Sequence, residues 1–115
     1  MRLLVALIQP TKLKAVQEAL AKIGVERMTV CDALGYGQQR GHSSVGSSAS
    51  QAKLLRKVAL EIAVNEDFLD KTVDTIAHVA KSGPRGAIGD GKIFVLPAEE
   101  VIRLSDTIRG PEAVS

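Results

Sequence analysis

The stretch LLVALIQPTKLKAVQEALAKIG (residues 3–24) changes its hydrophobic period at Pro10, and this change decides the fold. Before the proline, residues 3–9 form a short apolar run, which is typical of a buried strand. After it, apolar residues recur at the spacing of one helix face, at Leu13, Val16, Leu20 and Ile23. Gly24 then provides a helix stop. The stretch therefore predicts a β-strand followed at once by an α-helix.

The same succession of strand and helix returns later in the chain, after a further strand. Residues 27–35 and 57–64 alternate with a period of two, which predicts strands. Asn65 is a good N-cap for a second helix that ends at Gly83. The buried stripe of this helix is expected at Leu69, Val73, Ile76, Ala77 and Ala80. Residues 92–96 give a fourth strand, residues 99–104 are expected to add one helical turn, and the tail at 105–115 is expected to be loosely held.

The predicted order βαββαβ is that of an α+β, ferredoxin-like domain, with a four-stranded antiparallel sheet and two helices on one face. The chain has 115 residues, which suits a single domain over residues 1–115. The sheet face without helices carries small and mostly apolar residues, namely Thr29, Cys31, Ala33, Ala59 and Ala63. A face of this kind favours close approach of another subunit, so a homo-oligomer is expected. The alternative is a surface that is merely low in polarity.

Composition excludes several classes of protein. The apolar run at residues 3–8 is too short for a membrane span, so no direct membrane insertion is expected. A single cysteine, Cys31, cannot form an intramolecular disulfide, which favours a reducing, cytoplasmic location. A net charge of +2 and three aromatic residues argue against nucleic-acid binding. His42 and His78 show no spacing typical of a metal site or a catalytic pair, so no enzyme activity is expected.

A long connection joins the second and third predicted strands, at about residues 37–56, where a hairpin needs only about two to five. It is rich in serine and glycine, and such loops are usually functional or disordered. No acidic residue lies between Asp32 and Glu61, whereas Arg40, Lys53, Arg56 and Lys57 do. This stretch is expected to attract anions, and the alternative is a solvated basic loop without a role.

Two glycine motifs are expected at ends of the sheet, GYGQQRG (residues 35–41) and IGDGKI (residues 88–93). Their glycines Gly35, Gly37, Gly89 and Gly91 let backbone N–H groups approach an anion closely. The cations Arg40, Lys92 and Arg103 could supply charge for phosphate. Neither motif is a Walker A sequence. A plain turn is the alternative for each motif taken alone.

The element order, the long loop and the motifs GYGQQRGH, KVALEIAV, IGDGKIFV and VIRL together resemble the PII signal-transduction family, from residue 1 to about 104. The resemblance implies a homotrimer that binds adenine nucleotides between subunits and regulates a transporter or metabolic enzyme through its T-loop (residues 37–56). It implies a phosphate-binding B-loop within residues 82–92, at Gly89, Asp90, Gly91 and Lys92. It places Thr29, Glu61 and Ala63 near the adenine and ribose, and Arg103 at the phosphates of the neighbouring subunit. The residues Gly35, Gly37, Gln38 and Gln39 fall at the nucleotide cleft and loop base, and an anionic effector is expected at Gln39, Arg40 and Lys57.

The departures from the family pattern bear on ligand preference. Gln38 and Ser105 stand where the family usually has basic residues, so ADP or AMP is expected to bind better than ATP. The B-loop is enlarged by Pro84–Ala87 (PRGA), in which Arg85 could restore one charge. The loop middle, SSVGSSASQA, lacks the tyrosine that many bacterial members modify. These features favour a branch linked to inorganic carbon, with bicarbonate as co-ligand, and the alternative is a nitrogen-regulatory member that senses 2-oxoglutarate and controls an ammonium transporter or a nitrogen-assimilation enzyme.

Overall fold

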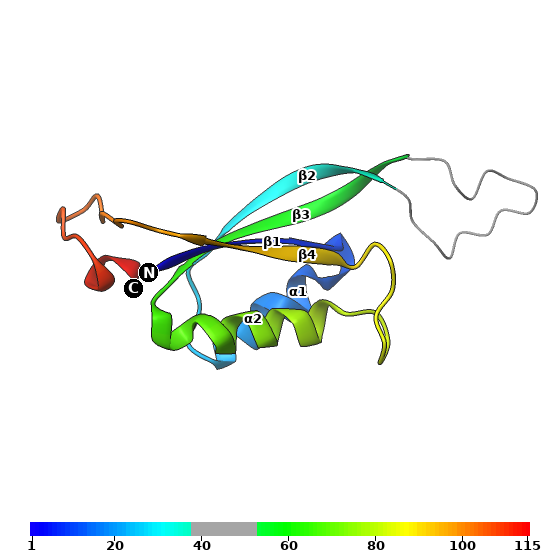
Figure 1. The fold of residues 1–115 in the computed structure, drawn as a ribbon, viewed down its shortest axis with the longest axis horizontal. Coiled ribbons are helices and arrows are strands. Elements are labelled where there is room, and N and C mark those ends of the chain that lie inside the picture. Colours follow the sequence, from blue (N-terminus) through cyan, green and yellow to red (C-terminus); the bar gives the residue numbers. More distant parts are fainter. Residues whose placement is uncertain (38–52) are drawn as a thin grey trace, which may run out of the picture.

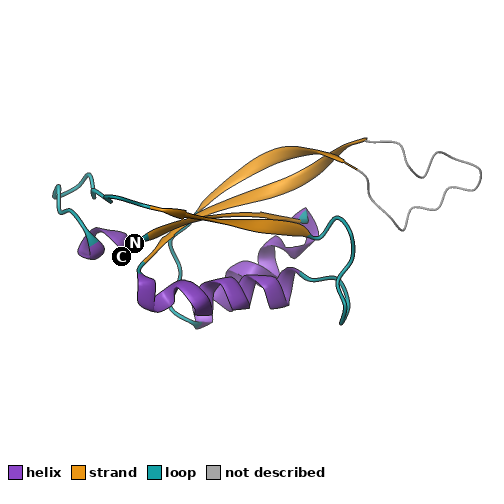
Figure 2. Cartoon of the chain, in the orientation of Figure 1, coloured by secondary structure: helices purple, strands orange, loops and turns teal. Residues whose placement is uncertain are grey.

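A computed structural model describes residues 1–37 and 53–115, and these residues form two layers, a sheet and a pair of helices (Figure 1). Both α-helices lie on the same face of the sheet, and the opposite face carries none of the described helices (Figure 2). The elements are, in chain order, β1 (Arg2–Ile8), η1 (Pro10–Lys12), α1 (Leu13–Lys22), β2 (Thr29–Gly37), β3 (Lys53–Val64), α2 (Glu66–Ala80), β4 (Gly91–Pro97) and η2 (Pro111–Val114). This arrangement confirms the predicted ferredoxin-like βαββαβ fold.

The sheet is antiparallel throughout, in the order β2-β3-β1-β4, so β1 and β3 are central. From Leu4 onward in β1 and from Val58 onward in β3, every second residue faces the helices and is buried, as alternation along a half-covered strand requires. The largest fully buried side chains of the sheet are Leu4, Ile8, Leu60 and Ile62, and they pack with Val16, Leu20 and Ile76 of the helices. The strand and helix predicted over residues 3–24 are confirmed, and Gly24 ends α1 with φ +89°.

Helix α2 buries a slightly different stripe from the one that the apolar pattern predicts. Ile76 and Ala80 are buried as expected, and Leu69 and Val73 pack against the core. The prediction for Ala77 is wrong, because this residue is exposed. Thr72 is buried in its place, and its hydroxyl donates to the carbonyl oxygen of Phe68 (2.7 Å). A threonine can face the core here because its hydroxyl bonds one turn back along the helix.

Strands β2 and β3 form a ribbon that projects beyond the helices (Figure 1). The alternating pattern predicts that β3 begins at residue 57, but the strand begins at Lys53 and β2 runs on to Gly37. Leu34 and Tyr36 are 68% and 77% exposed on this ribbon, which shows that the helices do not cover it. The remainder of the predicted T-loop, residues 38–52, lies outside the described residues.

The segment after β4 differs from both expectations for it. Residues 99–104 do not form the predicted helical turn; Ile102 instead makes an antiparallel bridge with Arg109. The tail is not loosely held, because Ala113 in η2 is buried and Asn65 Nδ2 donates to the carbonyl oxygen of Pro111 (3.1 Å). Apolar valine and isoleucine in this segment suit a bridged turn as well as a helix, so hydrophobicity alone does not separate the two.

Candidate functional site

The uncovered face of the sheet is mainly apolar over its central strands. Cross-strand pairing sets Leu3 beside Ala63, and Leu7 beside Ala59. On the edge strand β4, Phe94 is 47% exposed and Leu96 is 42% exposed. The prediction of a small, mostly apolar face is confirmed at Ala33, Ala59 and Ala63, each of which is half-buried. Leu3, Val5, Leu7, Phe94 and Leu96 add larger apolar groups that the sequence prediction omitted.

Two of the predicted site residues lie directly opposite each other on this face, and a third follows along the strand. Thr29 pairs with Glu61 across β2 and β3, and both side chains are exposed. Ala63 lies two residues further on and points to the same face. This group, called the distal group here, comprises Thr29, Glu61 and Ala63.

The B-loop (residues 82–92) begins at the end of α2, and one carboxylate organises it. Asp90 accepts hydrogen bonds from the Ser82 backbone N–H (3.0 Å), the Ser82 hydroxyl (2.6 Å) and the Ala87 N–H (2.8 Å). Burial acts to raise the pKa of Asp90, but the hydrogen bonds from Ser82 and Ala87 outweigh it and leave the pKa below its ordinary value. Asp90 therefore braces the loop with its carboxylate, a function that the glycine motif alone does not indicate.

Gly91 marks the point where the B-loop meets β1. Its φ is +117°, and a Cβ at this position would overlap the carbonyl oxygen of Leu7 and lie 2.8 Å from the Leu7 carbonyl carbon. Glycine is required here for both reasons, since other residues rarely adopt this backbone and none would fit. The close approach fixes the start of β4 against the end of β1.

The carbonyl oxygen of Gly89 joins the B-loop to two strands. Lys57 Nζ of β3 and Gln9 Nε2 at the end of β1 both donate to it, the latter at 2.8 Å. The Lys57 stem also covers Gly35, since a Cβ there would lie 3.3 Å from Lys57 Cγ. The structure thus brings together the predicted residues Gly35, Lys57 and Gly89. The sequence prediction did not include Gln9. Its position between the last residue of β1 and Pro10 could have indicated a polar side chain at the end of the sheet.

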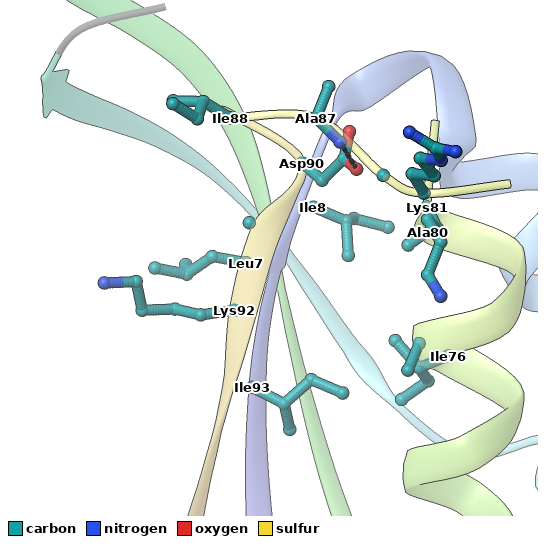
Figure 3. A pocket seen from close by; sticks show the side chains of 14 residues that line it. Leu7, Ile8, Ile76, Ala80, Lys81, Ala87, Ile88, Asp90, Lys92 and Ile93 are labelled. Atoms are coloured by element: carbon teal, nitrogen blue, oxygen red, sulfur yellow. Dashed lines mark hydrogen bonds between the residues drawn. The ribbon is translucent and has the colours of Figure 1, made fainter. Parts of the chain in front are cut away.

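Lys92 and Arg85 lie on different sides of β4. Lys92 is exposed, pairs with Leu7 in the sheet, and points with it to the uncovered face (Figure 3). Arg85 lines a hollow on the side of the sheet that carries the helices. Of these two predicted phosphate contacts, Lys92 shares a face with Lys57, and Arg85 does not. The residues Gly35, Lys57, Gly89, Gly91 and Lys92 are called the B-loop group here.

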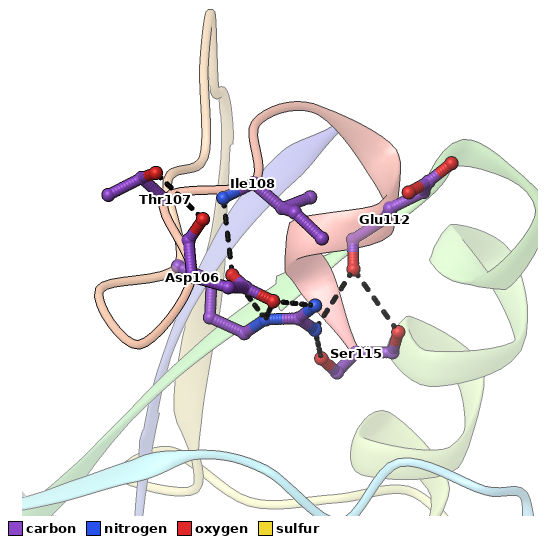
Figure 4. Close-up of polar contacts among 6 residues, drawn as sticks. Asp106, Thr107, Ile108, Glu112 and Ser115 are labelled. Carbon is purple, nitrogen blue, oxygen red and sulfur yellow. Dashed lines mark hydrogen bonds and ion pairs between the residues drawn. The ribbon is translucent and has the colours of Figure 1, made fainter.

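The segment that follows β4 lies at the opposite end of the molecule from the B-loop (Figure 1). Its Arg103 holds the last turn of the chain together through contacts with Asp106 and Ser115, two residues labelled in Figure 4. Its Nε and Nη2 donate to the Asp106 carboxylate, at 2.7 Å for Nη2 with Oδ2, and Nη1 donates to the backbone oxygen of Ser115 (3.0 Å). The Arg103 hydrogen bond lowers the pKa of Asp106, with help from the Ile108 N–H, and raises that of Arg103. The sequence prediction did not include Asp106, because a residue three positions after Arg103 contacts it only when the chain turns between them.

The predicted site residues thus fall into two separate groups within one chain. Lys57 and Ala63 are six residues apart on β3, which corresponds to about 20 Å along the strand. Arg103 lies beyond the distal group, past the end of β4. Gly37 ends β2, and Gln38, Gln39 and Arg40 lie outside the described residues. A ligand that contacts both groups of one chain would have to span most of the sheet.

Residues 1–37 and 53–115 contain neither a cluster of metal-binding side chains nor a helix that could span a membrane. No three histidine, cysteine, aspartate or glutamate side chains in this part of the chain are placed to hold a metal ion. Neither α1 nor α2 combines the length and the apolar character needed to cross a membrane. At the B-loop end of the uncovered face, the cations Lys57 and Lys92 favour an anionic ligand, whereas the carboxylate Glu61 lies toward the other end.

Comparison with known proteins gives a consistent result. A family model described as nitrogen regulatory protein P-II matches residues 1–107. Nitrogen regulatory protein GlnK1 of Methanosarcina mazei is 45% identical over 115 residues, which is 99% of this chain and 97% of that protein. Nitrogen regulatory protein P-II of Klebsiella oxytoca is 45% identical over 100 residues, covering 86% and 87%. The crystal structure of Arabidopsis thaliana PII bound to citrate superimposes with a TM-score of 0.79 at 34% identity, covering 99% of this chain and 89% of that one.

Proposed function

This chain belongs to the nitrogen regulatory protein P-II family, and from that premise we propose that it is a trimeric, cytoplasmic sensor of adenine nucleotides. In this proposal the protein catalyses no reaction. It reports the bound nucleotide to a partner protein through the T-loop between β2 and β3. The observation that supports the proposal is that the predicted site residues form two groups at opposite ends of the same sheet face.

The uncovered face supplies the reason for assembly. Phe94 and Leu96 are nearly half exposed there, beside the half-buried Leu3, Val5 and Leu7. Burying an exposed apolar face against other copies of the chain is favourable at about 25 cal/mol per Å². In a closed ring each subunit presents one end of its sheet to a neighbour, so the distal group of one chain can meet the B-loop group of the next.

In the assembled cleft, the B-loop group would bind the phosphates and the distal group the adenosine. The positive φ values of Gly89 (+100°) and Gly91 (+117°) shape a backbone that can present N–H groups to an anion. Lys92 points to the same face and is exposed, so its ammonium group is available for a charge-assisted contact. Thr29 and Glu61 offer a hydroxyl and a carboxylate for hydrogen bonds with the base and ribose.

Nucleotide preference in this proposal depends on the last turn of the chain. Arg103 is the cation expected at the terminal phosphates of the neighbouring site, and Asp106 engages it by several hydrogen bonds. A terminal phosphate must therefore compete with this carboxylate, and Ser105 adds no charge. ADP and AMP lose less from this competition than ATP, which supports a preference for the shorter nucleotides.

The contact from Lys57 and Gln9 to Gly89 offers a route from the nucleotide to the T-loop. Lys57 lies on β3, the strand that leads back from the T-loop, so a change at the B-loop alters the anchor of that strand. A small anion bound near Lys57 would compete for the same ammonium group. We propose 2-oxoglutarate for this position ahead of bicarbonate, because the relatives are named as nitrogen regulators. The regulated partner would then be an ammonium transporter or an enzyme of nitrogen assimilation.

Calorimetric titration with AMP, ADP and ATP tests this function, with and without 2-oxoglutarate or bicarbonate. We expect binding of ADP and AMP, a weaker signal for ATP, and loss of roughly tenfold or more in affinity for Lys92→Ala. Lys71→Ala removes an exposed cation of α2 and is the matched control. Absence of nucleotide binding below millimolar concentration would contradict the sensor proposal, and tighter binding of ATP than of ADP would contradict the preference for ADP.

A further inference from the structure

A hollow of about 610 Å³ opens between α2, the B-loop and β4, on the side of the sheet that carries the helices (Figure 3). Sites for small organic ligands typically measure roughly 300–1,000 Å³, so the hollow is large enough for one. The side chains of Ile8, Ile76 and Ile93 point into it. Leu7 and Lys92 border the hollow, but their side chains point to the opposite face. The hollow is therefore distinct from the proposed nucleotide cleft.

The floor of the hollow is apolar, and its rim is basic. Ile76 and Ala80 of α2 and Ile8 of β1 form the floor, while Ile88 on the B-loop beside it is 54% exposed. Lys81 and Arg85, both exposed, supply the cations of the rim. Asp90 is the one acidic group among the described lining residues, and its carboxylate already accepts hydrogen bonds from Ser82 and Ala87. The hollow therefore combines apolar surface with positive charge that its own acidic group leaves largely uncompensated.

We propose that this hollow binds an organic anion with an apolar body, of the kind represented by a medium-chain carboxylate. The hydrocarbon chain would lie over Ile76 and Ile93, where it replaces water on apolar surface. The carboxylate would lie at the rim, within reach of Lys81 and Arg85, both of which can donate charge-assisted hydrogen bonds. A purely apolar ligand would make no contact with the two cations. An inorganic anion would leave the apolar floor exposed to water.

The enlarged part of the B-loop builds this site. Arg85, Gly86 and Ala87 all line the hollow and belong to the PRGA stretch. Gly86 has φ +72°, and a Cβ there would lie 3.2 Å from Asp90 Oδ2, so the loop folds tightly over its bracing carboxylate. The extra residues thus add a second surface behind the B-loop, and this surface does not depend on nucleotide binding for its chemistry.

Titration of the full chain with octanoate tests the site, followed by methyl NMR of the isoleucine, leucine and valine side chains and by calorimetry. We expect the signals of Ile8, Ile76 and Ile93, whose side chains point into the hollow, to shift in a saturable way. Arg85→Ala should weaken octanoate binding by about fivefold or more, since exposed charged contacts are weaker than buried ones. Ala77→Phe, at an exposed lining position, should fill the hollow and abolish binding, while Lys71→Ala, outside it, should leave affinity unchanged.

Three outcomes of the octanoate titration by itself would overturn the proposal. These are the absence of isoleucine shifts at millimolar octanoate, shifts confined to Leu3 and Val5 on the uncovered face, and equal losses in Arg85→Ala and Lys71→Ala. If Ala77→Phe fails to fold, the comparison of Arg85→Ala with Lys71→Ala decides alone, since both positions are exposed. Repeating the titration with ADP present shows whether octanoate competes at the nucleotide cleft, and such competition would also overturn the assignment.

Discussion

Replacement of Gly91 by alanine probes the junction between the B-loop and the sheet. The new Cβ would overlap the carbonyl oxygen of Leu7 and lie 2.8 Å from its carbon, and the residue would have to keep φ near +117°. The positive φ costs about 1–2 kcal/mol. Relief of the overlap requires β4 to move away from β1, which disrupts the hydrogen bonds around the Ile8 and Gly91 pair at about 1 kcal/mol each. The expected loss in unfolding free energy is roughly 3–5 kcal/mol.

Gly83→Ala is the matched control for this variant. Gly83 also has a positive φ (+68°), but a Cβ there would meet nothing within 4 Å, so only the backbone term of about 1–2 kcal/mol applies. Urea unfolding followed by circular dichroism measures both variants, at one protein concentration because assembly stabilises the folded chain. If Gly91→Ala were as stable as Gly83→Ala, the B-loop would not be fixed against β1 as described.

Three further substitutions and one change of pH test individual features of the structure. Asp106→Asn removes the charge that competes for Arg103, so ATP affinity measured by calorimetry should rise about fivefold relative to AMP, and an unchanged ratio would show that the pair does not set preference. The pKa of Asp106 is lowered in the folded chain, so the stabilisation by its carboxylate is present at neutral pH and disappears as the pH falls through that lowered pKa. The protection factor of the Ile108 N–H, which compares measured exchange with the intrinsic rate at the same pH, should therefore fall there. A constant protection factor would contradict this. Lys57→Met keeps the stem over Gly35 but removes the donor to Gly89, so exchange at the B-loop amides should increase while β1 stays protected. Thr107→Gly relieves a φ of +56° and should raise the unfolding free energy by about 0.5–1 kcal/mol in urea, whereas a loss would show that the threonine backbone is unstrained.

The fold was predictable from the sequence because its signals are local. The period change at Pro10 and the alternation along residues 57–64 report which side of each element is covered. The predictions were wrong where a contact between side chain and backbone, or between distant segments, determines the structure in place of the local pattern. Thr72 faces the core because its hydroxyl bonds to Phe68, and the segment around Ile102 forms a bridge to Arg109 that no local pattern shows.

The candidate site was predictable in its residue types but not in its geometry. Glycines and lysine in IGDGKI indicate an anion site, and the structure places Lys92 on the uncovered face with Lys57. The same motif does not show that Asp90 braces the loop, or that Arg103 is held by Asp106. Both contacts depend on how a loop closes on itself, and residue spacing alone leaves that closure undetermined.

A mixing experiment tests the central claim, that two chains complete each nucleotide site. Lys92→Ala removes a cation of the B-loop group, and Arg103→Ala removes the cation that the neighbouring chain would contribute to the same site. Each variant alone should therefore bind ADP weakly. When the two are unfolded together and reassembled at equal amounts, a random trimer contains intact pairings in about a quarter of its clefts. Calorimetry should therefore recover high-affinity ADP binding with that stoichiometry. Absence of recovery in mixed trimers, confirmed by mass spectrometry, would contradict a site shared between neighbouring chains.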